Sequence, residues 1–175
     1  MKNSLYTLFR VGENYFLLPI DKVLYYGETK YQKVLIARNN VLGTFLVLDN
    51  KLQSAEIDEY RYHEALTYPA IICHKNARRV LIIGNGEGSI VKILSKVKSI
   101  RKIVWVDIDD ELVKICKRFL PYSFKFDSKK VKFYSMDGLE YLKKFNEKYG
   151  IIIFDLTDPS HENPLSNKLY SLKSA

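Results

Sequence analysis

The chain has 175 residues, 47% of them hydrophobic and 27% charged, a balance typical of a globular protein and not of a disordered chain. No segment reaches the roughly 20 consecutive apolar residues of a membrane helix, and the N-terminus lacks the pattern of a signal peptide, so we expect no membrane association. The formal net charge is +8, but the Lys residues are scattered along the chain, which favours a solvated basic surface over a nucleic-acid-binding face.

The first third of the sequence predicts a small antiparallel β domain over residues 1–57. Short apolar runs follow one another there and are separated by Gly and Pro: TLFRV, YFLLPI, KVLYYGE, QKVLIAR and GTFLVLD. Asp49 and Asn50 lie between two such runs and tolerate the positive φ of a hairpin turn. The spacing of residues 54–74 then predicts a helix with Pro69 near its end.

From Arg79 onward, strand-like and helix-like segments alternate, which predicts a parallel α/β sheet. Four strands are expected, at 80–84, 103–107, 131–137 and 151–155. The expected helices cover 89–97, 109–119 with Asp109 as N-cap, and 139–145. Uniformly apolar strands such as VLIIG indicate that both faces of this sheet are covered.

The loop after the first of these strands has the sequence Gly84-Asn85-Gly86-Glu87-Gly88-Ser89. Glycines at this place let the backbone approach a nucleotide beside the N-terminus of the next helix, although the same loop also serves as a tight turn without a ligand. Asp107 follows about 20 residues later at the tip of the second strand, where an acid binds ribose hydroxyls. The spacing favours a nucleoside site and fits NAD enzymes and S-adenosylmethionine enzymes equally.

Acidic residues also follow the other strands. Because the carboxyl ends of parallel strands meet at one edge of a sheet, we expect five acids to share a pocket that suits a cationic substrate: Glu87, Asp107, Asp137, Asp155 and Asp158. Taken singly, Asp137 is equally placed to cap a helix, and Asp158 to begin a turn.

The two cysteines, Cys73 and Cys116, lack metal-type or redox-type spacing, which is typical of a protein of the reducing cytoplasm. His74 and His161 have no partner at metal-ligand spacing, so no metal site is expected. His63 stands alone on a predicted helix, where it is either a packed residue or a ligand-binding one.

Seven segments of the chain match, in order and spacing, the motifs of one protein family. They are Tyr31-Gln32, Leu48-Asp49-Asn50 with Gln53, DEYRYHE (58–64), VLIIGNGEGS (80–89), Asp107-Ile108-Asp109, Met136-Asp137-Gly138 and DLTDP (155–159). Over nearly its whole length the chain thus resembles the spermidine synthases. The resemblance implies that residues 58–175 form an incomplete Rossmann-like sheet of the class I methyltransferase type, preceded by the small β domain.

The resemblance also implies the activity of a polyamine aminopropyltransferase. Such an enzyme transfers an aminopropyl group from decarboxylated S-adenosylmethionine, a co-substrate, to putrescine or a related amine, and keeps no permanently bound cofactor. A primary amine with a pKa of about 10 must lose a proton before it attacks, and a carboxylate at the junction can take it. The leaving group is a neutral thioether, so most of the catalysis can come from alignment.

Roles follow residue by residue from the matched motifs. The nucleotide-binding positions would be Gln32, Gly84, Gly86, Glu87, Asp107, Asp137, Gly138 and Pro164. The amine-binding positions would be Gln53, Tyr62, His63, Asp155 and Asp158. Among them Asp155 would be the proton acceptor, and Glu87 would meet the ammonium of the aminopropyl chain.

The sequence also departs from the family pattern. GNGEGS replaces GGGDGG, Asp107 replaces a Glu, and DLTDP replaces DSSDP, which leaves the acceptor amine open. Related enzymes continue well beyond a segment like Leu169-Tyr170-Ser171, so we expect the strand at 151–155 to be left as a sheet edge. The chain would then need a homo-oligomer or a missing C-terminal half.

Two other functions stay open from the sequence. One is a non-catalytic remnant that binds nucleotide or polyamine. The other is an S-adenosylmethionine-dependent methyltransferase, which is disfavoured because Glu87 would face the methionine carboxylate.

Overall fold

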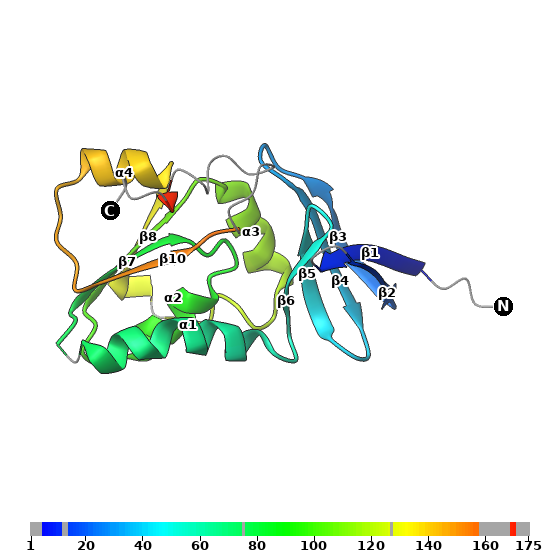
Figure 1. The fold of residues 1–175 in the computed structure, drawn as a ribbon, viewed down its shortest axis with the longest axis horizontal. Coiled ribbons are helices and arrows are strands. Elements are labelled where there is room, and N and C mark those ends of the chain that lie inside the picture. Colours follow the sequence, from blue (N-terminus) through cyan, green and yellow to red (C-terminus); the bar gives the residue numbers. More distant parts are fainter. Residues whose placement is uncertain (1–4, 12–13, 75, 127, 158–168, 171–175) are drawn as a thin grey trace.

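A computed structural model describes residues 5–11, 14–74, 76–126, 128–157 and 169–170. The chain consists of an antiparallel β part and an α/β part that lie side by side (Figure 1). None of the helices in the described ranges is long and apolar enough to cross a membrane.

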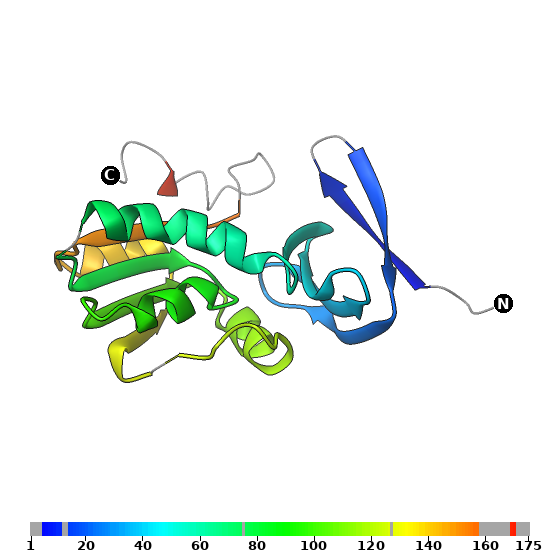
Figure 2. The same ribbon diagram turned by 90° about the horizontal axis from the view of Figure 1, so that it is seen from below.

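The β part contains a two-stranded hairpin and a four-stranded antiparallel sheet whose strands pair in chain order. The hairpin is β1 (Leu5–Val11) with β2 (Asn14–Ile20), and the sheet is β3 (Lys22–Glu28), β4 (Lys33–Asn39), β5 (Gly43–Leu48) and β6 (Lys51–Ala55). The predicted turn between β5 and β6 is confirmed, since Asp49 and Asn50 have φ of 46° and 61°. Figure 2 shows the β1–β2 hairpin projecting beyond the four-stranded sheet, on the side away from the α/β part.

The α/β part confirms the expected alternation of strands and helices. Its elements are α1 (Glu59–Cys73), β7 (Arg79–Gly84), α2 (Ser89–Lys96), β8 (Lys102–Asp107), α3 (Asp110–Phe119), a 3₁₀ turn (Ser128–Lys130), β9 (Val131–Ser135), α4 (Gly138–Lys144) and β10 (Ile151–Asp155). All strands are parallel, in the order β10-β7-β8-β9.

The central strand β7 is covered on both faces, as its apolar sequence predicts. Val80 and Ile82 pack in the core between the sheet and helices α1 and α2, whereas Leu81 and Ile83 pack on the opposite face of the sheet with Tyr141 of α4. Figure 1 shows α4 above the sheet and α1 and α2 below it. This arrangement leaves the carboxyl ends of the strands facing the β part.

Helix α3 joins the two parts of the molecule. Its apolar face, with Leu112, Ile115 and Cys116, packs against Val34 and Ile36 of β4. The carboxyl ends of β7 and β8 therefore lie next to the four-stranded sheet, and residues of that sheet can reach the predicted nucleotide site.

Three expectations change in the structure. Helix α1 begins at Glu59 instead of residue 54, because Ser54 and Ala55 pair with β5. The third strand ends at Ser135 instead of Asp137, because Asp137 caps α4. Strand β10 is not covered on both faces along its length, since Ile152 is 47% exposed.

Candidate active site

The loop between β7 and α2 is bent tightly against the end of β10. Gly84 has a φ of +90°, and a Cβ at this position would lie 2.1 Å from the Asp155 carbonyl oxygen, so only glycine fits. The backbone N–H of Asn85 donates to that same oxygen at 2.9 Å. At Gly86 a Cβ would lie 2.7 Å from Leu112 Cδ2, so this glycine lets α3 approach the loop.

Asn85, which stands where the family motif has glycine, makes two side-chain hydrogen bonds that glycine could not make. It has a φ of 67°, a conformation that Asn tolerates better than most residues. Its side-chain oxygen accepts a hydrogen bond from Ile90 N at 3.0 Å, and its amide donates to Asp155 Oδ2 at 2.8 Å. The substitution therefore ties the loop to the predicted proton acceptor.

Glu87 lies at the centre of a buried polar cluster. Its side chain is 10% exposed, with Oε1 2.8 Å from Nε2 of His63 and Oε2 2.5 Å from the hydroxyl of Ser54. The other ring nitrogen of His63, Nδ1, lies 2.7 Å from the carbonyl oxygen and 3.1 Å from Oε2 of Glu59. The structure thus places His63 between two carboxylates. His63 is therefore part of a polar network and not simply a packed residue.

The charge of His63 follows from these partners. Burial alone would lower its pKa, but hydrogen bonds with Glu59 and Glu87 outweigh burial and raise the pKa to about 10. His63 is therefore an imidazolium at neutral pH and donates from both ring nitrogens. Burial raises the pKa of Glu59, but its hydrogen bonds with His63 and Lys92 outweigh burial and lower it.

Asp155 lies at the carboxyl end of β10, as the sequence pattern predicts. Tyr62 donates to its Oδ1 at 3.1 Å, and Asn85 donates to its Oδ2. Burial raises the pKa of Asp155, and the charge of His63 opposes part of this rise. Tyr62 and His63 follow each other on α1, so one helix turn contacts both Asp155 and Glu87.

Asp107 and Asp109 form a second acidic group, at the end of β8. Asp107 is 9% exposed, and burial raises its pKa to about 7. Its Oδ1 accepts from the backbone N–H of Asp109 at 2.9 Å. Asp109 Oδ2 accepts from Gln32 Nε2 at 2.9 Å and from Thr29 Oγ1 at 2.6 Å. Gln32, a predicted nucleotide ligand, is thus brought to this strand end from the β part.

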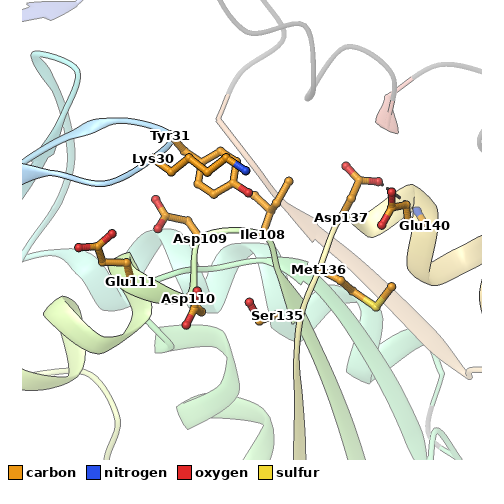
Figure 3. A pocket seen from close by; sticks show the side chains of 10 residues that line it. All are labelled: Lys30, Tyr31, Ile108, Asp109, Asp110, Glu111, Ser135, Met136, Asp137 and Glu140. Atoms are coloured by element: carbon orange, nitrogen blue, oxygen red, sulfur yellow. Dashed lines mark hydrogen bonds between the residues drawn. The ribbon is translucent and has the colours of Figure 1, made fainter.

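A cavity of about 450 Å³ opens beside this second group (Figure 3). Its floor is formed by the segments after β8 and β9, and Lys30 and Tyr31 reach over Asp109 and Ile108 from the turn between β3 and β4. It is lined by Lys30, Tyr31, Ile108, Asp109, Asp110, Glu111, Ser135, Met136, Asp137 and Glu140. The volume is in the range of small-molecule sites.

Asp137 lines this cavity and also caps α4. Its Oδ1 accepts from Leu139 N at 2.8 Å and Glu140 N at 3.0 Å, the capping role that the sequence left open. At Gly138 a Cβ would lie 2.5 Å from Cγ2 of Ile83, so packing requires glycine there. The five predicted acids therefore do not all line one cavity: Glu87 belongs to the buried cluster, and Asp137 to the open cavity.

The remaining predicted residues have different outcomes. Gln53 is exposed on β6, and its amide donates to the carbonyl oxygen of Lys51, so the structure does not bring it to the Glu87 cluster. Its neighbour Ser54 contacts Glu87 instead, and no motif in the sequence marks Ser54 as a site residue. Asp158 and Pro164 lie outside the described residues.

Among the residues that the structure describes, no group of three or more His, Cys, Asp or Glu side chains has a geometry that could hold a metal ion.

Comparisons with known proteins identify the family of the chain. Residues 59–173 match the spermine/spermidine synthase domain, and residues 13–56 match the spermidine synthase tetramerisation domain. Polyamine aminopropyltransferase 1 of Hyperthermus butylicus is 41% identical over 160 residues, which are 89% of this chain and 54% of that protein. Thermospermine synthase ACAULIS5 of Arabidopsis thaliana is 41% identical over 146 residues, 83% of this chain and 43% of that protein.

Solved structures are similar in fold. A spermidine synthase in complex with the transition-state analogue AdoDATO has a TM-score of 0.90 at 26% identity, over 97% of this chain and 58% of that one. Spermidine synthase from Thermotoga maritima has a TM-score of 0.85 at 27% identity, over 93% of this chain and 57% of that one. The chain spans about half the length of the curated relatives it matches. By its matched domains and its fold, the chain belongs to the spermine/spermidine synthase family.

Proposed function

We propose that this chain carries the donor site and part of the acceptor site of a polyamine aminopropyltransferase. The donor would be decarboxylated S-adenosylmethionine, and the acceptor putrescine or a related amine. The proposal is supported by the family membership and by the solved relative in complex with AdoDATO. The observation that carries it is the buried pairing of Glu87 and His63 beside Asp155, at the tips of two neighbouring strands.

The proposed reaction is a displacement at carbon. The lone pair of the acceptor nitrogen attacks the methylene carbon bound to the sulfonium, so that a C–N bond forms while the C–S bond breaks. The electron pair of the broken bond stays on sulfur, which leaves as a neutral thioether, methylthioadenosine. The proton released by the acceptor ammonium goes to Asp155, whose raised pKa makes it a better base than an exposed carboxylate.

Glu87 would select the decarboxylated donor. Its carboxylate attracts the ammonium of the aminopropyl chain and repels the α-carboxylate that S-adenosylmethionine would bring. The cavity beside Asp109 and Asp137 would hold the adenosine part, with Asp107 and Gln32 at its edge.

The decisive experiment compares donors in the 175-residue chain. We expect calorimetry to show tighter binding of decarboxylated S-adenosylmethionine than of S-adenosylmethionine, by tenfold or more, roughly the worth of one charged hydrogen bond. Glu87→Gln should abolish this preference, whereas Glu64→Gln, one position from His63 on α1, should keep it. Equal affinities in the unmodified chain would refute the proposal.

Incubation with putrescine and each donor in turn separates the remaining functions. Because this chain carries part of the acceptor site, mass spectrometry should find spermidine together with methylthioadenosine where the homo-oligomer completes that site. A methylated acceptor with S-adenosylhomocysteine, formed from S-adenosylmethionine, would indicate a methyltransferase instead. Donor binding with no product from the assembled oligomer would indicate a binding remnant.

The protein is also proposed to assemble as a homo-oligomer through its β part. Large apolar side chains are exposed on both strands of the hairpin: Leu5, Tyr6, Leu8, Tyr15, Phe16 and Leu17. Such a patch on one hairpin is typical of a protein–protein contact, and the family model that matches residues 13–56 is named for tetramerisation. Light scattering of the chain measures the assembly directly.

A further inference from the structure

Six residues, Glu87 among them, are joined into a closed ring of hydrogen bonds, in which Tyr122 takes part through both its backbone carbonyl oxygen and its hydroxyl. In order around the ring they are Glu87, His63, Glu59, Lys92, Tyr122 and Ser54. They come from the loop after β7, helices α1 and α2, the segment after α3, and strand β6. The ring therefore connects the β part, both helices under the sheet and the predicted donor site.

The direction of each bond follows from the chemistry of the groups. A carboxylate only accepts, so the Ser54 hydroxyl donates to Glu87 at 2.5 Å, and the Tyr122 hydroxyl must donate to Ser54 at 2.8 Å. On the other side, Lys92 Nζ donates to Glu59 Oε1 at 2.8 Å and to the carbonyl oxygen of Tyr122 at 2.7 Å. Every bond of the ring thus has a donor and an acceptor, as buried polar groups require.

The ring also balances charge. Two carboxylates, Glu59 and Glu87, face two cations, His63 and Lys92, and all four side chains are at most 15% exposed. Each Glu87 oxygen accepts one ring bond, and a carboxylate oxygen can accept a second, so each oxygen keeps one position for a cationic ligand. The ring holds the Glu87 carboxylate in one orientation without using all of its hydrogen-bond acceptor positions.

We propose that Ser54, Tyr122, Glu59 and Lys92 are positioning residues that aim Glu87 at the ammonium of the donor. Glu87 touches the ligand in the proposed function, on which this inference rests, and the four positioning residues act through it, Glu59 and Lys92 by way of His63. Opening the ring would weaken the preference of the site for decarboxylated S-adenosylmethionine over S-adenosylmethionine, even though the four positioning residues never contact the donor.

Opening the ring at Ser54 or Tyr122 tests the inference in the full chain. Ser54→Ala and Tyr122→Phe should weaken binding of decarboxylated S-adenosylmethionine roughly tenfold, the effect of one hydrogen bond to a charged group. Methylthioadenosine has no aminopropyl ammonium, so its affinity should stay unchanged. Ser54→Thr keeps the hydroxyl and should restore donor affinity. Tyr149→Phe, which removes a hydroxyl bonded to Tyr141 away from the site, is the matched control.

A purely structural role would give another pattern. If Ser54→Ala and Tyr122→Phe weaken both ligands equally, or leave donor affinity unchanged, the positioning role is refuted. Thermal unfolding of both variants identifies any loss of folded protein.

The ring also has a readout that needs no ligand. The groups that face His63 are Glu59, Glu87, Asp155 and the ring of Tyr62. Glu59→Gln removes a buried negative charge beside His63 and leaves Lys92 in place, so the pKa of His63 in an NMR titration should fall by roughly one to three units. Glu64→Gln on the same helix should shift it far less. If the pKa of His63 is unchanged in Glu59→Gln, the proposed ring of hydrogen bonds is refuted.

The two readouts separate this inference from the proposed function. If the unmodified chain shows no donor preference, the proposed function fails, and the ring is then judged on the His63 titration alone. If the preference exists and survives in Ser54→Ala and Tyr122→Phe, the proposed function stands and the positioning role fails.

Discussion

At the scale of single residues, burial and partners set the charges on which the site depends. The pKa of His63 is raised to about 10, so the stability that its ion pairs contribute is complete below its ordinary pKa of 6.5 and is lost as pH rises through about 10. Asp107 behaves differently because burial disfavours its charged form and raises its pKa to about 7. Between pH 4 and 7 the unfolded chain releases this proton and the folded chain keeps it, so stability falls as pH rises.

Asp107→Asn should remove this loss of stability, because Asn has the shape of a neutral Asp and carries no proton that titrates here. We expect the gain in melting temperature of the variant over the unmodified chain to be larger at pH 8 than at pH 5. Thermal unfolding at the two pH values measures it, with exposed Asp110→Asn as the control. The same difference at both pH values would contradict the raised pKa of Asp107.

Asp155→Asn should act on turnover instead of nucleotide binding. Loss of a general base lowers kcat by roughly 10² to 10⁴, whereas methylthioadenosine affinity should change little, because the amide keeps the contacts to Tyr62 and Asn85 partly in place. Steady-state kinetics and calorimetry measure the two quantities. An unchanged kcat would show that another base serves, with Asp158 as the candidate.

At the scale of secondary-structure elements, helix N-termini organise the site. Asp109 uses Oδ1 to cap α3 through Leu112 N and uses Oδ2 to hold Gln32 and Thr29. One side chain thus starts a helix and fixes the turn between β3 and β4 against it. The positions of α3 and of Gln32 are therefore coupled through a single carboxylate.

Asp109→Ala should be destabilising, because the variant loses the cap of α3 and the carboxylate oxygen that accepts from Gln32 and Thr29 of the β part. We expect a loss of roughly 1–3 kcal/mol in the free energy of unfolding, measured by urea denaturation. Asp110→Ala, which removes the exposed carboxylate of the next residue, should change stability little. Equal losses in the two variants would argue against the coupling.

At the scale of the whole molecule, strand β10 is an edge of the sheet in the described ranges, with β7 as its neighbour. Its four apolar residues, 151–154, carry no charge or proline that would deter pairing with another chain. Ile152 is 47% exposed beside Ile153, which is 4% exposed. Within the described residues the edge is therefore open to pairing, and we expect it to be a second association surface besides the β1–β2 hairpin.

Ile152→Lys should reduce self-association without unfolding the chain, because a charged side chain on an edge strand blocks pairing while the residue stays in solvent. Analytical ultracentrifugation over a range of concentrations measures the association. Ile153→Lys, which would bury a charge, should instead lower the melting temperature strongly. Unchanged association in Ile152→Lys would place the contact elsewhere, with the β1–β2 hairpin as the next candidate.

Much of the fold could be read from local patterns in the sequence. The alternating and continuous apolar runs determined the strands, Asp49 and Asn50 the hairpin turn, and Asp109 the start of α3, because these features depend on neighbouring residues. The acids that end β8 and β10, Asp107 and Asp155, were also predictable, since parallel strands align their carboxyl ends. The division into residues 1–57 and 58–175 stays a prediction.

The tertiary structure alone decided which of these residues meet. Ser54 reaches Glu87 across 33 positions, Gln32 reaches Asp109 across 77, and Tyr62 reaches Asp155 across 93. Such contacts depend on how α3 packs against β4 and how α1 packs against β10, which no local pattern encodes. Gln53 and Ser54, adjacent in the chain, have different partners because the register of β6 shifts here: Ser54 pairs with Leu46 and Leu52 with Val47, which leaves Gln53 without a partner on β5. The sequence determined the residues of the site, and the packing of the two parts determined which of them surround Glu87.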